Sequence, residues 1–168
     1  YFSLKAGVRW PLDVLAEEGF AYDSSILPID RLPGLELVSP RSPYALRADL
    51  WEVPIAVSRF GFWHLPMLGG FALRALPEAF VRRRLEQFEA EIGPAVLHVH
   101  PWEIDPGAPE AESVPRAVRG LKRVGRKGLA GKLRRLLRAY SFGSIAEVFP
   151  ESRGAGARPI AAKLAPSA

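Results

Sequence analysis

The spacing of apolar residues predicts two amphipathic helices in this chain. Over residues 77–92 and over residues 127–140, apolar positions recur every three or four residues, and charged side chains fill the positions between them. The apolar positions are Val81, Leu85, Phe88 and Ile92 in the first segment, and Leu129, Leu133, Leu136, Leu137 and Tyr140 in the second. We therefore expect each helix to bury one stripe and to leave its other face in water.

Short apolar runs between turn residues predict strands. Residues 20–23, 51–57 and 95–100 are of this kind, and the third run has few polar interruptions, as expected for a parallel strand covered on both faces. Pro54 interrupts the second run and predicts an edge strand or an irregularity there. A short helix is expected over residues 9–18, before the first strand. Helices that alternate with strands predict an α/β fold with a largely parallel sheet.

Length and composition indicate one domain. The chain has 168 residues, 48% of them hydrophobic, which is enough for a domain with its own core. Four prolines in residues 27–47 predict a loop. From residue 150 onward Gly, Ala, Pro and Ser dominate without a core pattern, which predicts a disordered tail over residues 150–168. The domain is therefore expected over residues 1–149, and no apolar run in the sequence is long enough to span a membrane.

Positive charge is concentrated in one segment. The net charge is +5, yet no acidic residue lies between Glu112 and Glu147. The basic residues there are Arg116, Arg119, Lys122, Arg123, Arg126, Lys127, Lys132, Arg134, Arg135 and Arg138. A basic helical extension over about residues 116–140 suits an anionic membrane, a nucleic acid or an acidic polysaccharide, or simply a solvated helix face. Nucleic acid is not expected as a partner, because no aromatic interleaving or recognition motif accompanies the charge.

The stretch VLHVHPWEID holds the clearest candidate chemistry. His98 and His100 stand two residues apart on an expected strand, so both side chains point to the same face. Two imidazoles could serve a zinc site, but such a site needs a third ligand, and Glu103, Asp105 and Asp23 have no diagnostic spacing. A general acid requires only one imidazole at a strand end. Two packed imidazoles without a function are the remaining alternative.

Other motifs exclude several classes of enzyme. The chain has no Cys, so it has neither disulfides nor a thiolate zinc site. No glycine-rich phosphate loop and no G-x-S-x-G motif is present, which argues against nucleotide binding of those types and against a serine hydrolase. Trp102 fits either a core position or a platform for a sugar ring. Asp23 fits either a turn cap beside Ser24 and Ser25 or a site residue at a strand end.

Five segments resemble, in order, the polysaccharide deacetylases: GFAYDSSILPI, WEVPIAVSRFG, the Gly-Gly and ALRALP stretch, VLHVHPWEIDP and KLRRLLRAYSF. The most similar subgroup is found in bacterial exopolysaccharide loci linked to exosortase sorting systems, and HPWEID followed by Pro is its most specific mark. The resemblance implies a distorted (β/α) barrel and hydrolysis of an N-acetyl group on a sugar. A divalent metal, usually zinc, is the implied cofactor. The implied partner is a polysaccharide or oligosaccharide that carries N-acetyl sugars.

The resemblance also implies catalytic residues. His100 corresponds to the general acid that protonates the leaving amine. Tyr1 corresponds to the end of an R-x-P-Tyr motif, whose backbone N–H binds the oxyanion. Asp23 corresponds to the carboxylate that tunes the arginine of that motif.

Substrate contacts are expected from three residues next to the general acid, namely Trp102, His98 and Glu103. His98 stands where the family usually has an apolar residue. Pro-Trp-Glu replaces the usual partner directly after the general acid.

Two motifs that the family carries upstream are absent from this chain. They are T-F-D-D and H-x-x-x-H, which supply the catalytic base and the metal ligands. We therefore expect the chain to be the C-terminal part of the barrel, with the metal ligands outside it and no activity on its own. The alternative is a non-catalytic module that binds a carbohydrate or an anionic surface.

Overall fold

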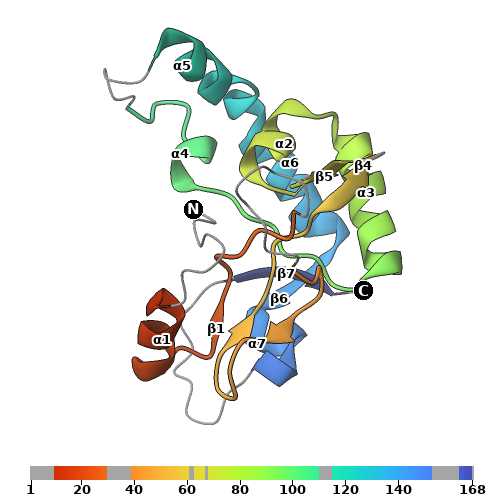
Figure 1. Cartoon of the computed structure of the whole chain (residues 1–168). Coiled ribbons are helices and arrows are strands. Elements are labelled where there is room, and N and C mark those ends of the chain that lie inside the picture. Colours follow the sequence, from red (N-terminus) through yellow and green to blue (C-terminus); the bar gives the residue numbers. More distant parts are fainter. Residues whose placement is uncertain are drawn as a thin grey trace.

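The computed structural model describes residues 10–29, 39–60, 63–66, 68–109, 115–152 and 163–167, with the backbone alone for residues 59–60, 63–65, 116–117, 151 and 163–167. Over these residues the chain is a mixed α/β protein (Figure 1). The helices are α1 (Trp10–Glu17), α2 (Gly70–Ala75), α3 (Glu78–Glu91), α4 (Pro101–Ile104), α5 (Arg116–Arg123), α6 (Arg126–Ala139), α7 (Ile145–Val148) and the 3-10 turn η1 (Pro150–Ser152). The strands are β1 (Tyr22–Asp23), β2 (Tyr44–Ala45), β3 (Trp51–Glu52), β4 (Ser58–Phe60), β5 (Trp63–Leu65), β6 (Ser141–Ser144) and β7 (Lys163–Ser167).

A small sheet of three strands has the order β1-β3-β2. β1 and β3 run parallel, and β2 is antiparallel to β3. The register sets Asp23 opposite Glu52 on one side and Tyr44 opposite Glu52 on the other. Register partners on neighbouring strands point to the same face. The sheet therefore places these three polar side chains in one row.

The helices predicted from apolar spacing are confirmed. α3 buries Val81, Leu85 and Phe88, and α1 covers the predicted range to within one residue at each end. In α6 Leu129 and Leu136 are buried, whereas Leu137 is 48% exposed. Adjacent residues on a helix lie about 100° apart, so only one of two neighbouring leucines faces the core. The basic extension is not one helix, because Gly125, with φ 67°, separates α5 from α6.

The two longer predicted strands form only in part. Of residues 51–57 only Trp51–Glu52 pairs as a strand, since Pro54 offers no N–H to a ladder. Residues 95–100 form no regular strand, a correction to the sequence prediction. They are held by single contacts: the N–H of His98 donates to the carbonyl of Leu68 at 3.2 Å, and the N–H of Ala56 donates to the carbonyl of Val96 at 3.4 Å.

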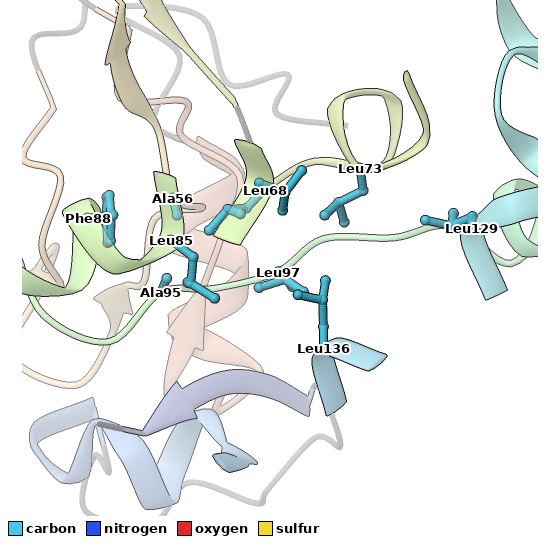
Figure 2. Close-up of a cluster of buried hydrophobic side chains, with 10 residues drawn as sticks. Ala56, Leu68, Leu73, Leu85, Phe88, Ala95, Leu97, Leu129 and Leu136 are labelled. Atoms are coloured by element: carbon cyan, nitrogen blue, oxygen red, sulfur yellow. The ribbon is translucent and has the colours of Figure 1, made fainter. Parts of the chain in front are cut away.

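Residues 95–97 are nevertheless covered on both faces, as predicted. Ala95 and Leu97 belong to one apolar cluster, and Val96 belongs to another. The first cluster contains Ala56, Leu68, Leu73, Val81, Leu85, Phe88, Ala95, Leu97, Leu129 and Leu136 (Figure 2). The second contains Ile29, Val53, Ile55, Val57, Val96, Ile145 and Phe149. The segment that leads to the histidines is therefore anchored between two cores.

Two elements lie within residues 150–168, where the sequence predicts a disordered tail, and residues 153–162 and 168 of that range lie outside the described residues. Residues Pro150–Ser152 form η1, and Lys163–Ser167 form β7, which pairs antiparallel with β6. Strand pairing uses backbone groups, so a segment without an apolar pattern can still pair with an available strand edge. None of the helices in the described part of the chain is long and apolar enough to cross a membrane.

Candidate active site

His98 and His100 lie at the end of the segment anchored between the two cores. His100 precedes α4, a helix of four residues that begins with Pro101. The N–H of His100 donates to Oε2 of Glu103 at 3.0 Å, and the N–H of Glu103 donates to the carbonyl of His100 at 3.0 Å. Proline suits the first position of a helix, because the N–H it lacks would have no partner there. The sequence HPWE thus forms a tight turn that brings Glu103 back onto His100.

The two imidazoles are in direct contact, as the shared strand face predicts. Their Nε2 atoms lie 3.3 Å apart, and the rings meet edge to face with centroids 4.5 Å apart. Burial lowers the pKa of His98, and the neighbouring His100 lowers it further. His98 is therefore neutral at pH 7, and one N–H lies between the two Nε2 atoms.

Glu103 orients His100 through its other ring nitrogen. Oε2 of Glu103 lies 3.2 Å from Nδ1 of His100. A carboxylate only accepts hydrogen bonds, so Nδ1 carries the proton and Nε2 is the atom available for proton exchange. The side chain of His100 is 25% exposed, whereas that of Glu103 is 4% exposed. The site therefore presents a partly accessible imidazole on a buried carboxylate.

Arg74 on α2 pairs with this buried carboxylate. Its Nε donates to Oε1 of Glu103 at 3.1 Å, and the two side chains are 2% and 4% exposed. One terminal nitrogen of Arg74 donates to the carbonyls of Lys122 and Val124 at 2.6 and 2.8 Å. A Cβ on Gly125 would lie 2.1 Å from the carbonyl oxygen of Arg74, so only glycine allows this approach. Arg74 thus joins α2, α4 and the α5–α6 junction at one point.

Gly70 makes room for Glu103. A Cβ on Gly70 would lie 1.7 Å from Oε2 of Glu103. The sequence shows the Gly69-Gly70 pair only as a break before a helix, and Arg74 only as a helical charge. The resemblance covers both in its Gly-Gly and ALRALP stretch, which is the one signal that points to them.

Trp102 lies beside the histidines and among cations. Its ring stacks on His100, with centroids 5.7 Å apart and planes 29° apart. The guanidinium carbons of Arg74 and Arg126 lie 5.4 and 5.6 Å from the Trp102 ring centroid, and Nζ of Lys122 lies 5.6 Å from it. Three positive groups within about 6 Å of one indole fit cation–π geometry. Trp102 is therefore a partly exposed residue of the site and not a core residue.

Asp23 belongs to a second cluster, in the three-stranded sheet. Oγ of Ser25 donates to Asp23, and Asp23 lies in register with Glu52. Glu52 is fully buried, and its Oε1 accepts the N–H of Ile26 at 3.0 Å. Burial and then the charge of Asp23 raise the pKa of Glu52 to about 8. Its Oε2 has no hydrogen-bond partner among the described residues.

Two further predictions from the sequence concern Tyr1 and a metal site. Tyr1 lies outside the described residues. Among the residues that are described, no group of three or more His, Asp or Glu side chains is placed to hold a metal ion. The described residues therefore do not fit the divalent metal that the resemblance implies. Glu52, which sequence reasoning missed, looks in the sequence like an ordinary polar residue of an edge strand.

Comparison with known families places residues 24–150 in a domain of unknown function (DUF3473), and the chain belongs to this family. The matched residues include the histidine cluster, Arg74 and the basic helices. No curated protein and no solved structure matches the chain.

Proposed function

We propose that this protein takes part in the hydrolysis of N-acetyl groups on a polysaccharide, with His100 as the general acid. The observation that carries the proposal is the imidazole of His100, whose side chain is partly exposed and is held at Nδ1 by the buried Glu103. The sequence resemblance to polysaccharide deacetylases supports it, and the matched family is associated with such enzymes.

The proposed chemistry assigns a separate task to each residue. Hydrolysis of the amide adds a hydroxyl to the acetyl carbon and a proton to the sugar nitrogen as the C–N bond breaks. Nε2 of His100 gives that proton to the leaving amine. Glu103 keeps the other nitrogen protonated and stabilises the ring when it is charged, and Arg74 holds Glu103 in place.

His98 is the immediate partner of the reacting atom. Its Nε2 atom lies 3.3 Å from the Nε2 atom of His100. In this proposal, Nε2 of His98 helps to hold the exchangeable proton at Nε2 of His100 until the leaving amine accepts that proton. This role requires a neutral His98, and the lowered pKa of His98 supports it.

A distorted (β/α) barrel is the fold that we propose for the family domain. Three features support it: the parallel pairing of β1 with β3, the parallel contact between Gly69 and His98, and a buried segment before the histidines. Catalytic groups of such barrels lie at the C-terminal ends of strands. His100 follows the buried segment over residues 95–97, which forms no regular strand but makes a parallel contact through His98, and this placement supports the proposal.

The test is acetate release from N-acetylated oligosaccharides by the protein expressed from its complete reading frame. His100→Ala is expected to lower kcat by about 10²–10⁴-fold, the usual contribution of general acid catalysis. Circular dichroism of the variant controls for folding, and partial recovery of the rate with added imidazole would show that a proton donor is missing.

An unchanged kcat would remove His100 from the mechanism. The second candidate function is a carbohydrate-binding module without turnover, which the placement of Trp102 beside the histidines favours. Glycan binding by the wild type without any acetate release would support that module against the deacetylase.

A further inference from the structure

We propose that Lys122 and Trp102 form a subsite for the acidic group of a polyanionic polysaccharide, next to His100. The inference names the substrate class and thus rests on the proposed function. Its structural basis is the cationic collar, defined as the three positive side chains of Arg74, Lys122 and Arg126 around the Trp102 ring.

The three members of the collar have different tasks. Arg74 is 2% exposed and is occupied by Glu103 and by two backbone carbonyls, so it serves the architecture. Lys122 is partly exposed at the end of α5 and makes no ion pair with any described residue. Arg126 begins α6, is 6% exposed and extends to the same ring. The collar therefore combines two buried cations with one more accessible cation, Lys122.

Local charge favours an anion at this place. Glu103 is the buried carboxylate of the cluster, and Arg74 already matches it. Lys122 and Arg126 add positive charge beside that pair, and they belong to a segment without an acidic residue between Glu112 and Glu147. Guanidinium and ammonium groups bind carboxylates through charge-assisted hydrogen bonds. A ligand carboxylate would supply the negative charge that α5 and α6 lack.

The indole makes a glycan the occupant that fits best. Trp102 is partly exposed beside Lys122, and its ring lies 5.7 Å from the His100 ring, so a sugar held by Lys122 can contact the exposed part of the indole. An acidic sugar held here would bring a neighbouring N-acetyl sugar of the same chain toward His100. A site for single-stranded nucleic acid needs several stacking aromatic side chains along a basic groove. Here Lys122 and Arg126 both contact the single ring of Trp102.

The experiment measures binding by the full chain with isothermal titration calorimetry. The probes are oligogalacturonate, which carries carboxylates, a sulfated oligosaccharide, and a neutral N-acetylated chito-oligosaccharide. Oligogalacturonate is expected to bind more tightly than the neutral probe, and its affinity should fall as the salt concentration rises. Lys122→Met keeps the side-chain length and removes the charge. It should lower the affinity for oligogalacturonate roughly fivefold, which is the usual effect of losing a partly exposed charge contact.

The matched control is Lys127→Met, which removes an equal charge from an exposed position on α6. This variant should bind oligogalacturonate as the wild type does. Equal weakening by both variants would overturn the subsite, because only the net charge would then matter. Tighter binding of the sulfated probe than of oligogalacturonate would overturn the choice of a carboxylate.

Further arms separate this inference from other anionic partners and from the proposed function. A single-stranded oligonucleotide and phosphatidylserine vesicles are tested in the same way. If the binding of either depends on Lys122 as strongly as the binding of oligogalacturonate does, the glycan assignment is overturned. Acetate release from the neutral probe, without preference for acidic glycans, would overturn the subsite and keep the deacetylase. Lys122-dependent binding of oligogalacturonate without acetate release would support the subsite and remove the deacetylase.

Discussion

Two buried glutamates stand in opposite electrostatic surroundings. Glu103 meets the guanidinium of Arg74 and the ring of His100, whereas Glu52 meets the carboxyl of Asp23. Burial penalises the charged form of Glu52, and the charge of Asp23 adds to that penalty. In the first cluster the carboxylate orients an imidazole for proton exchange. In the second the pKa rises to about 8, so the carboxyl of Glu52 is largely protonated at pH 7.

The comparison teaches that the neighbour of the buried carboxyl distinguishes the two clusters, because each buried glutamate lies beside a partly exposed side chain, His100 in the first and Asp23 in the second. His100 is partly exposed, and it connects Glu103 to the surface. Glu52 is fully buried in the sheet. The histidine cluster therefore offers a partly exposed imidazole held by a buried carboxylate, whereas the second cluster places two acidic side chains together.

The largest expected effect comes from breaking the ion pair in the first cluster. Arg74→Met should lower the free energy of unfolding by about 3–5 kcal/mol, because it leaves Glu103 buried without its cation. Urea denaturation measures this loss. The double variant Arg74→Met with Glu103→Gln should recover part of it, since no unpaired charge remains. A loss no larger than that of Arg83→Met, an exposed arginine on α3, would contradict the structural role of Arg74.

A smaller effect is expected from crowding Glu103. Gly70→Ala puts a methyl group where Oε2 of Glu103 now lies, so the carboxylate must move away from His100. We expect a loss of about 1–3 kcal/mol in unfolding free energy, as for overpacked sites. Gly120→Ala in α5 is the matched control, because a Cβ there meets nothing within 4 Å. Equal stability of the two variants would show that Glu103 does not need the space.

The second cluster predicts a pH dependence of stability. The pKa of Glu52 is raised from 4.5 to about 8 in the folded chain, so between these values the folded state holds a proton that the unfolded state releases. Its stabilising contribution is complete below pH 4.5 and is lost as pH rises to about 8. The loss amounts to about 1.4 kcal/mol per pH unit.

Glu52→Gln should remove this slope, because the amide still accepts the N–H of Ile26 but has no proton to lose. Denaturation curves of wild type and variant at several pH values measure the difference. Glu18→Gln, an exposed position after α1, should leave the slope unchanged. Identical slopes for wild type and Glu52→Gln would contradict the raised pKa.

Apolar spacing was a reliable guide to local structure. α3 and α6 lie where the repeats predict them, since a stripe at helical spacing buries only in a helix. The shared face of His98 and His100 also follows from local geometry, because side chains two residues apart in extended backbone point the same way. Regular strands were overpredicted over residues 95–100, since a ladder depends on partners that lie elsewhere in the chain.

The sequence by itself determined the helices, the two-sided burial before the histidines and the short-range turn from His100 to Glu103. Each of these depends on residues within a few positions of one another. Only the tertiary structure decided which cation meets Glu103 and which carboxyl meets Glu52. Arg74 and Asp23 are 29 positions from those partners in the sequence, and nothing in local spacing encodes such a contact. Packing of α2 against the α4–α6 region sets the first contact and strand register sets the second, so these contacts follow from how the elements assemble.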